Sequence, residues 1–152
     1  MGLDMYLDRH VYVGAHKYDK TIKKPKITVE GVTPSKVTYI IEEAMYWRKA
    51  NAIHSWFVDN VQERNDNCGT YYVSKENLQE LYDTICELLA KKDSKDILKE
   101  VADTLPPQSG FFFGGTDIDE YYWEDLEETK KGLKEILDKK NDRAEYYYHS
   151  SW

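Results

Sequence analysis

Apolar and polar side chains alternate along residues 3–13 of the chain. Odd-numbered positions hold Leu3, Met5, Leu7, Val11 and Val13, and even-numbered positions hold Asp4, Tyr6, Asp8, His10 and Tyr12. A period of two is typical of a β-strand that packs one face on a core and leaves the other in water. The pattern therefore predicts an amino-terminal strand whose Leu3 side is covered.

Residues 36–47, KVTYIIEEAMYW, combine two tendencies. β-branched and aromatic residues favour a strand, whereas the Glu-Glu-Ala-Met stretch suits a helix. We expect a strand, because the apolar residues do not continue the helical face that begins after them; a helix is the alternative. Shorter strands are predicted over residues 26–30, 70–73 and 145–149, and a lysine-rich loop over residues 14–25.

Four segments show the 3.6-residue period of amphipathic helices. The clearest covers residues 48–63, whose apolar side chains share one face. Ser74 is a good N-cap for a second helix. Ser94 begins a shorter helix that stops before Pro106, and a last helix runs to about Lys140.

The order of these elements indicates the fold class. Strands at both ends with helices between them predict an α+β protein, in which a mainly antiparallel sheet includes the first and last strands and about four helices pack on one face. A chain of 152 residues is expected to form a single domain over residues 1–152. We therefore expect both termini to be held in one sheet.

Charge and composition restrict the partners. With 28 acidic and 21 basic residues the net charge is -7, which disfavours nonspecific binding to nucleic acid. No apolar run approaches the ~18 residues of a membrane span, and the amino terminus lacks a signal-peptide pattern, so a cytoplasmic protein without membrane contact is expected. Cys68 and Cys86 are expected to stay reduced. No metal-ligand spacing occurs, so no metal and no cofactor are predicted.

The segment YWRKANAIH, residues 46–54, is the main candidate site. Arg48 can hold a phosphate or carboxylate, Asn51 can read an amide or base edge, and His54 can donate a hydrogen bond or exchange a proton. On a helix they lie between core and solvent, so we expect them to point into one aromatic cleft. The predicted ligand-binding set is Tyr46, Trp47, Arg48, Asn51, His54, Phe111, Phe112, Phe113 and Tyr147.

Each candidate also has a structural interpretation. Arg48 can pair with a carboxylate, His54 can be a hydrogen-bonded histidine at the core edge, and the glycine-rich loop 109–116 can be a latch over the core. Residues 117–128 hold seven acids and three aromatics, which suits a basic partner or a well-capped solvated helix. No hydrolase, P-loop or dinucleotide motif occurs, so the catalytic residue is unknown, and it is His54 if the protein is an enzyme.

The opening MGLDMYL, the central YWRKANAIH, the GFFFG loop and the closing YYYHSSW resemble a family of small bacteriophage and prophage proteins. The resemblance implies a phage protein in the host cytoplasm and implies no chemistry. By analogy with phage accessory proteins, it suggests counter-defence. The resulting prediction is a protein that sequesters a small, nucleotide-like ligand in an aromatic pocket. The alternatives are a protein that blocks a host complex through residues 117–128, or a small metal-independent hydrolase or lyase.

Overall fold

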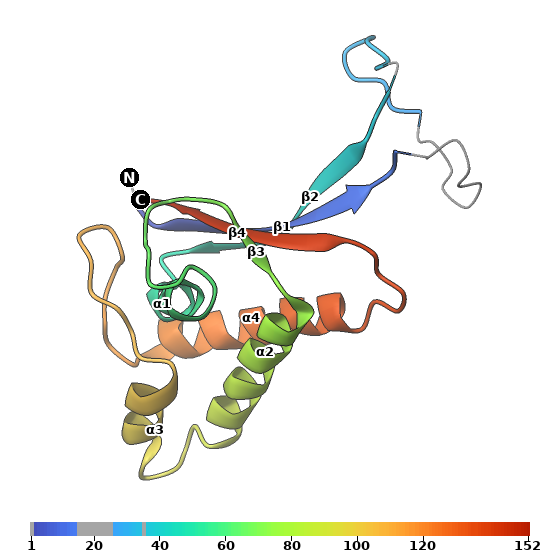
Figure 1. Ribbon diagram of the computed structural model, residues 1–152. Coiled ribbons are helices and arrows are strands. Elements are labelled where there is room, and N and C mark those ends of the chain that lie inside the picture. The colour runs from blue at the N-terminus through green and yellow to red at the C-terminus, as the bar shows by residue number, and fades with distance from the viewer. Residues whose placement is uncertain (1, 15–25, 35) are drawn as a thin grey trace.

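The computed structural model describes residues 2–14, 26–34 and 36–152 of the chain. The elements follow one another as β1 (Asp4–Tyr12), β2 (Tyr39–Arg48), α1 (Asn51–Asn60), β3 (Tyr71–Val73), α2 (Lys75–Ala90), α3 (Ile97–Thr104), α4 (Glu120–Leu137) and β4 (Glu145–Ser151). The four strands form one antiparallel sheet in the order β2-β1-β4-β3 (Figure 1). The predicted α+β fold is confirmed, with the first and last strands side by side in the sheet.

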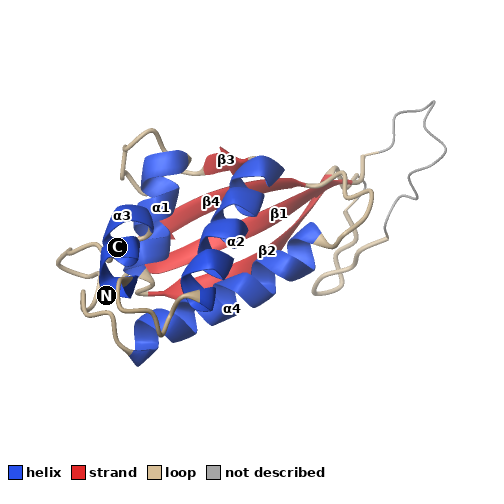
Figure 2. Cartoon of the chain, turned by 90° about the horizontal axis from the view of Figure 1, so that it is seen from below, coloured by secondary structure: helices blue, strands red, loops and turns tan. Residues whose placement is uncertain are grey.

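The helices all lie on one side of the sheet (Figure 2). Met5 and Leu7 of β1, and Leu3 just before it, belong to the core on that side and are fully buried. Tyr146 and Tyr148 of β4 are buried on the same side and belong to the same core. The covered face that the alternation predicted is therefore the face that the helices cover.

The β1–β2 hairpin contains one irregularity. Leu7 pairs with Met45 and Asp8 pairs with Glu43, so Ala44 is an extra residue between these two pairs. A β-bulge bends its strand and increases the local twist. Beyond the bulge, the far end of the hairpin rises on the side of the sheet that faces away from the helices (Figure 1).

The strand interpretation of residues 36–47 is confirmed from Tyr39 onward, and it shortens the helix predicted over residues 48–63. β2 continues to Arg48, and Lys49 then takes a left-handed backbone conformation (φ 61°) that turns the chain into α1. The helix ends at Asn60, and left-handed residues follow it at Glu63 and Arg64. Pairing with β1 thus takes Arg48, the first residue of the predicted helix, into the sheet.

Two further sequence predictions have different outcomes. The strand predicted over residues 26–30 is wrong, because Val29 and Val32 form only an isolated bridge across a turn. Gly31 in this turn has a φ of 79°, which a strand does not contain. Of the lysine-rich loop, residues 15–25 lie outside the described residues.

Ser74 caps α2 as the sequence predicted. Its hydroxyl accepts a hydrogen bond from the Asn77 backbone N–H at 3.0 Å, and the Asn77 side chain accepts one from the Ser74 backbone N–H at 3.3 Å. These reciprocal bonds form a capping box, which satisfies two N–H groups that the helix itself leaves unpaired. The cap therefore fixes where α2 begins.

Removing this cap tests its contribution to stability. We expect Ser74→Ala to lower the free energy of unfolding by about 1 kcal/mol, because the Asn77 N–H loses its acceptor. Ser94→Ala is the matched control, since Ser94 is exposed and α3 has no side-chain cap; it should cost less than about 0.5 kcal/mol. Urea unfolding followed by circular dichroism measures both, and equal losses would contradict this assignment.

Candidate functional site

A cavity of about 490 Å³ lies where β2 turns into α1. Its walls come from this turn, from the loop before α4 and from the first turns of α4. The lining residues that have polar side chains are Arg48, Lys49, Asn51, Asp117, Asp119, Tyr121, Tyr122 and Asp125. The volume is within the range of about 300–1,000 Å³ that is typical of small-molecule sites.

The β2–α1 turn brings two cationic residues to the cavity lining. Arg48 and Lys49 stand at the turn, and an Arg48 guanidinium nitrogen lies 3.0 Å from an Asp4 carboxylate oxygen. The first turn of α1 has neither a side-chain cap nor an acidic residue. The dipole of α1 therefore adds positive potential at this turn, where the two cations lie.

The loop before α4 and α4 itself bring three carboxyl groups to the cavity lining, those of Asp117, Asp119 and Asp125. Asp119 also accepts a hydrogen bond from the Tyr122 backbone N–H at 3.2 Å and so caps α4. Burial, with a smaller contribution from the neighbouring carboxylates, raises the pKa of Asp125 to about 6. Asp125 can therefore exchange a proton near neutral pH, which an ordinary aspartate cannot.

Asn51 lines the cavity, but its side-chain amide is already hydrogen-bonded within the protein. The amide nitrogen donates to the Phe113 and Gly115 carbonyl oxygens at 3.0 and 2.8 Å, and the amide oxygen accepts from the Gln108 backbone N–H at 3.0 Å. These bonds join α1 to the loop that forms the opposite wall. Asn51 thus shapes the cavity wall, rather than reading a ligand as the sequence suggested.

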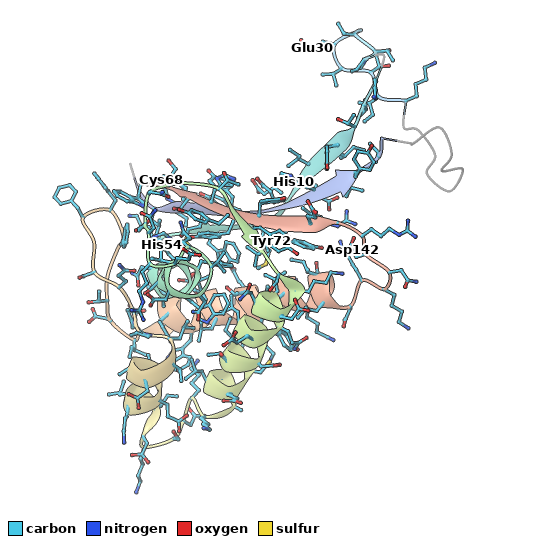
Figure 3. The ribbon with its side chains drawn as sticks, viewed as in Figure 1. His10, Glu30, His54, Cys68, Tyr72 and Asp142 are labelled. Carbon is cyan, nitrogen blue, oxygen red and sulfur yellow. The ribbon has the colours of Figure 1, made fainter. Side chains whose placement is uncertain are left out.

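His54 lies outside the cavity, and the expectation that it shares one cleft with Arg48 and Asn51 is wrong. Its side chain is 0% exposed and lies between α1 and the sheet (Figure 3). One ring nitrogen is 2.7 Å from the Tyr148 hydroxyl and the other is 3.0 Å from an Asp66 carboxylate oxygen. His54 is therefore a hydrogen-bonded core histidine, and it offers a ligand no free group.

The three phenylalanines of the loop before α4 have different environments. Phe111 is 96% exposed, Phe112 is half-buried and Phe113 is buried. Phe113 packs edge-on to His54, with ring centroids 5.1 Å apart. Phe113 is thus the latch that the structural interpretation described, and none of the three lines the cavity.

The remaining predicted residues also lie away from the cavity. Trp47 is buried and donates its indole N–H to the Thr129 hydroxyl at 2.8 Å. Tyr46 and Tyr147 lie on the face of the sheet without helices, where their hydroxyls bind Asp4 and Glu145. Of the nine predicted ligand-binding residues, the structure brings Arg48 and Asn51 together at the cavity.

The acidic segment 117–128 presents less aromatic surface than its sequence suggested. Tyr122 and Trp123 are buried, and the Tyr122 hydroxyl donates to the Leu105 carbonyl oxygen at 2.9 Å. Tyr121 alone among its three aromatics is exposed, at 75%. The segment therefore supplies one wall of the cavity and a helix start, instead of a broad aromatic contact surface.

Sequence reasoning missed the contributions of Lys49, Tyr121 and Asp125 to this cavity. Lys49 looked like an ordinary surface residue within a helix, because the turn that places it at the cavity depends on β2 ending at Arg48. Asp125 precedes buried Leu126 on α4, but its spacing gave no sign that α4 faces the start of α1. Such long-range contacts leave no local pattern.

Comparisons with known proteins gave no match: no protein-family model, no curated protein and no solved structure is similar to this chain. Within the part of the chain that the structure describes, no helix is long and apolar enough to cross a membrane. In the same part, no three His, Cys, Asp or Glu side chains come together in a group that could hold a metal ion.

The buried bond between Tyr148 and His54 can be tested with a conservative change. Tyr148→Phe leaves the His54 ring nitrogen without a partner, so we expect it to lower the free energy of unfolding by about 1–3 kcal/mol. Tyr147→Phe, the adjacent residue on the other face, removes a hydroxyl bound only to exposed Glu145 and should cost less than about 0.5 kcal/mol. Denaturant unfolding of both variants would contradict the structure if their losses were equal.

The raised pKa of Asp125 predicts a pH effect on stability. The folded state holds a proton that the unfolded chain releases between about pH 4 and about pH 6, so stability falls as pH rises through this window. Asp125→Asn should flatten this fall and raise the free energy of unfolding at pH 7 by about 1 kcal/mol, a value reduced for solvent screening of a half-buried group.

The matched control for Asp125→Asn is Glu127→Gln, which removes one negative charge from an exposed position of the same helix. Thermal unfolding from pH 4 to pH 8 measures both variants against the original chain. If Glu127→Gln flattens the profile as much as Asp125→Asn does, the effect belongs to the general charge of α4 and the assignment to Asp125 is wrong.

Proposed function

We propose that the protein binds a small polar ligand with an anionic end, of the nucleotide type, in the cavity between the start of α1 and the start of α4. The observation that carries this proposal is the separation of charge inside one cavity. Arg48 and Lys49 belong to the β2–α1 turn, whereas the three carboxyl groups belong to the loop before α4 and to α4. A ligand that has a phosphate at one end and hydrogen-bond donors at the other matches this arrangement.

The phosphate or carboxylate would occupy the end formed by α1. Backbone N–H groups of a helix start are ready donors to an anion, and the first turn of α1 brings no acid that would compete. Arg48 and Lys49 add charge-assisted hydrogen bonds, which are stronger than neutral ones. Lys49 is thereby a hydrogen-bond donor to the ligand, a role for which the sequence suggested His54.

The carboxyl end suits the other half of such a ligand. Carboxylates accept hydrogen bonds from sugar hydroxyls and from the amino or imino groups of a base. The exposed ring of Tyr121 offers a surface on which a base can stack. Asp125 adds pH dependence, because its neutral form donates a hydrogen bond where its charged form only accepts.

Binding without turnover is the form of the proposal that the residues support best. Within the cavity lining, Asp125 is the side chain with a pKa raised to the neutral range, and no second group is paired with it for acid–base or nucleophilic chemistry in the described residues. A role in sequestering a nucleotide signal in a phage-infected host follows from the resemblance of the sequence to phage proteins, and the cavity supplies its ligand chemistry.

Charge variants at the cavity test the proposal. The probes are a nucleoside 5′-monophosphate, its 3′,5′-cyclic form and inorganic phosphate, titrated into the full chain by calorimetry. We expect Arg48→Gln and Lys49→Gln each to weaken nucleotide binding about tenfold or more, because each loses a charge-assisted hydrogen bond. Arg64→Gln is the control, since it removes the same charge from an exposed position outside the cavity.

A steric variant separates the cavity from general charge. Gly115 lines the cavity, and a side chain added there meets open space, so Gly115→Leu should fill the cavity without removing a charge and should abolish binding. Mass spectrometry of the released ligand then distinguishes sequestration, which returns it intact, from turnover. No nucleotide binding at millimolar concentration, or equal weakening by Arg64→Gln, would refute the proposal.

A further inference from the structure

The face of the sheet that points away from the helices is uncovered (Figure 1). We call it the open face; the even-numbered residues of β1 and the residues paired with them lie on it. Its large exposed side chains are Tyr12, Tyr39, Ile41, Tyr46 and Tyr72. Because Tyr combines an apolar ring with a polar tip, such a surface is typical of protein contact sites.

The aromatic rings of the open face form separate groups of contacting rings. Tyr6 stacks on His149 with ring centroids 4.7 Å apart, and His10 lies 4.4 Å from Tyr147. Tyr12 meets Tyr39 edge-on at 5.1 Å. These contacts link β2, β1 and β4, so the rings hold one another in place and lose little freedom when a partner binds.

Carboxylates lie among these rings. Asp8 and Glu43 are directly opposite each other on β1 and β2, a like-charge pair that weakens a sheet unless a cation is near. Asp8 is 3.0 Å from a ring nitrogen of His149, while Glu43 is exposed and has no partner among the residues that the structure describes. The centre of the open face is therefore negative.

We propose that the open face is a docking surface for a basic segment of another protein, one rich in arginine. A guanidinium group can stack on a tyrosine ring and pair with a carboxylate at once, and the open face presents both around Asp8 and Glu43. The same carboxylates repel the phosphates of a nucleic acid. They also repel the equally negative face of a second copy of this chain.

The shape of the hairpin favours an extended partner. The bulge at Ala44 bends β1 and β2, and their far ends rise on the side of the open face (Figure 1). His10 lies on this side of the sheet, between the bulge and the Tyr12–Tyr39 pair (Figure 3). A segment laid along β1 would thus meet carboxylates first and tyrosines next.

The test uses the full chain and a capped hexa-arginine peptide as the probe. Titration calorimetry at low salt should show saturable binding that Asp8→Asn/Glu43→Gln weakens at least tenfold. The matched control is Glu124→Gln/Glu127→Gln, which removes two charges from exposed positions of α4 and should weaken binding less than twofold. Equal losses in the two double variants would overturn the proposal, because binding would then follow net charge alone.

The contribution of the tyrosine rings to peptide binding can be measured on the unmodified chain. Hexa-lysine carries the same charge as hexa-arginine but stacks less well, so we expect it to bind several-fold more weakly. Equal affinity for the two peptides, or tighter binding of an oligothymidylate of the same length, would overturn the proposal. So would a dimer in sedimentation experiments that Tyr39→Arg disrupts, because the open face would then be a self-contact.

This docking surface and the cavity are separate places on the molecule. Arg48 borders both places, through Asp4 on one side and the cavity on the other, and it is left unchanged in these variants. Thermal midpoints within about 3 °C of the original chain show that a variant is folded. Amide exchange of the unmodified chain should show protection along β1 and β2 with hexa-arginine, and protection confined to α4 would contradict the proposal.

Discussion

The core and the open face of the sheet both depend on the alternation of side chains along β1. This strand lies between β2 and β4, so its register sets which residues of both neighbours face the helices. A slip of one residue would exchange Leu3, Met5 and Leu7 with Asp4, Tyr6 and Asp8. Such a slip would bury charged side chains and expose fully buried apolar ones, so it is very costly. The register of β1 therefore fixes one core and one uncovered face.

The same alternation determines which face of the sheet each of three consecutive tyrosines in β4 points to. Tyr146 and Tyr148 point into the core, and each hydroxyl has a partner there, an Asp142 carboxylate oxygen at 2.7 Å and a His54 ring nitrogen at 2.7 Å. Tyr147 points to the open face. A sequence rich in tyrosine therefore serves two purposes, since buried polar partners make Tyr acceptable in the core and its ring suits an exposed contact surface.

The sequence predicted what depends on local pattern. The alternation of β1, the Ser74 cap and the stripe of α2 each involve residues within a few positions of one another, and all were confirmed. His54 shows what a local sequence pattern does not predict. Its angular position on α1 suggested a place at the edge of the core, but Asp66 and Tyr148 enclose it, and neither contact has a local signal. The cavity was missed in the same way, because it forms between elements far apart in the chain.

Arg48 connects the two proposed sites physically. The hydrogen bond from the Tyr46 hydroxyl, and after it the contact with Arg48, hold the pKa of the Asp4 carboxyl below its usual range, and Arg48 offsets its charge at the edge of the open face. A phosphate in the cavity that draws Arg48 toward itself would leave the negative charge of Asp4 less well balanced. The open face would then become more negative, and a basic partner would bind it more tightly. By linkage the partner would in turn favour the ligand, so occupancy of the cavity and of the open face would rise together.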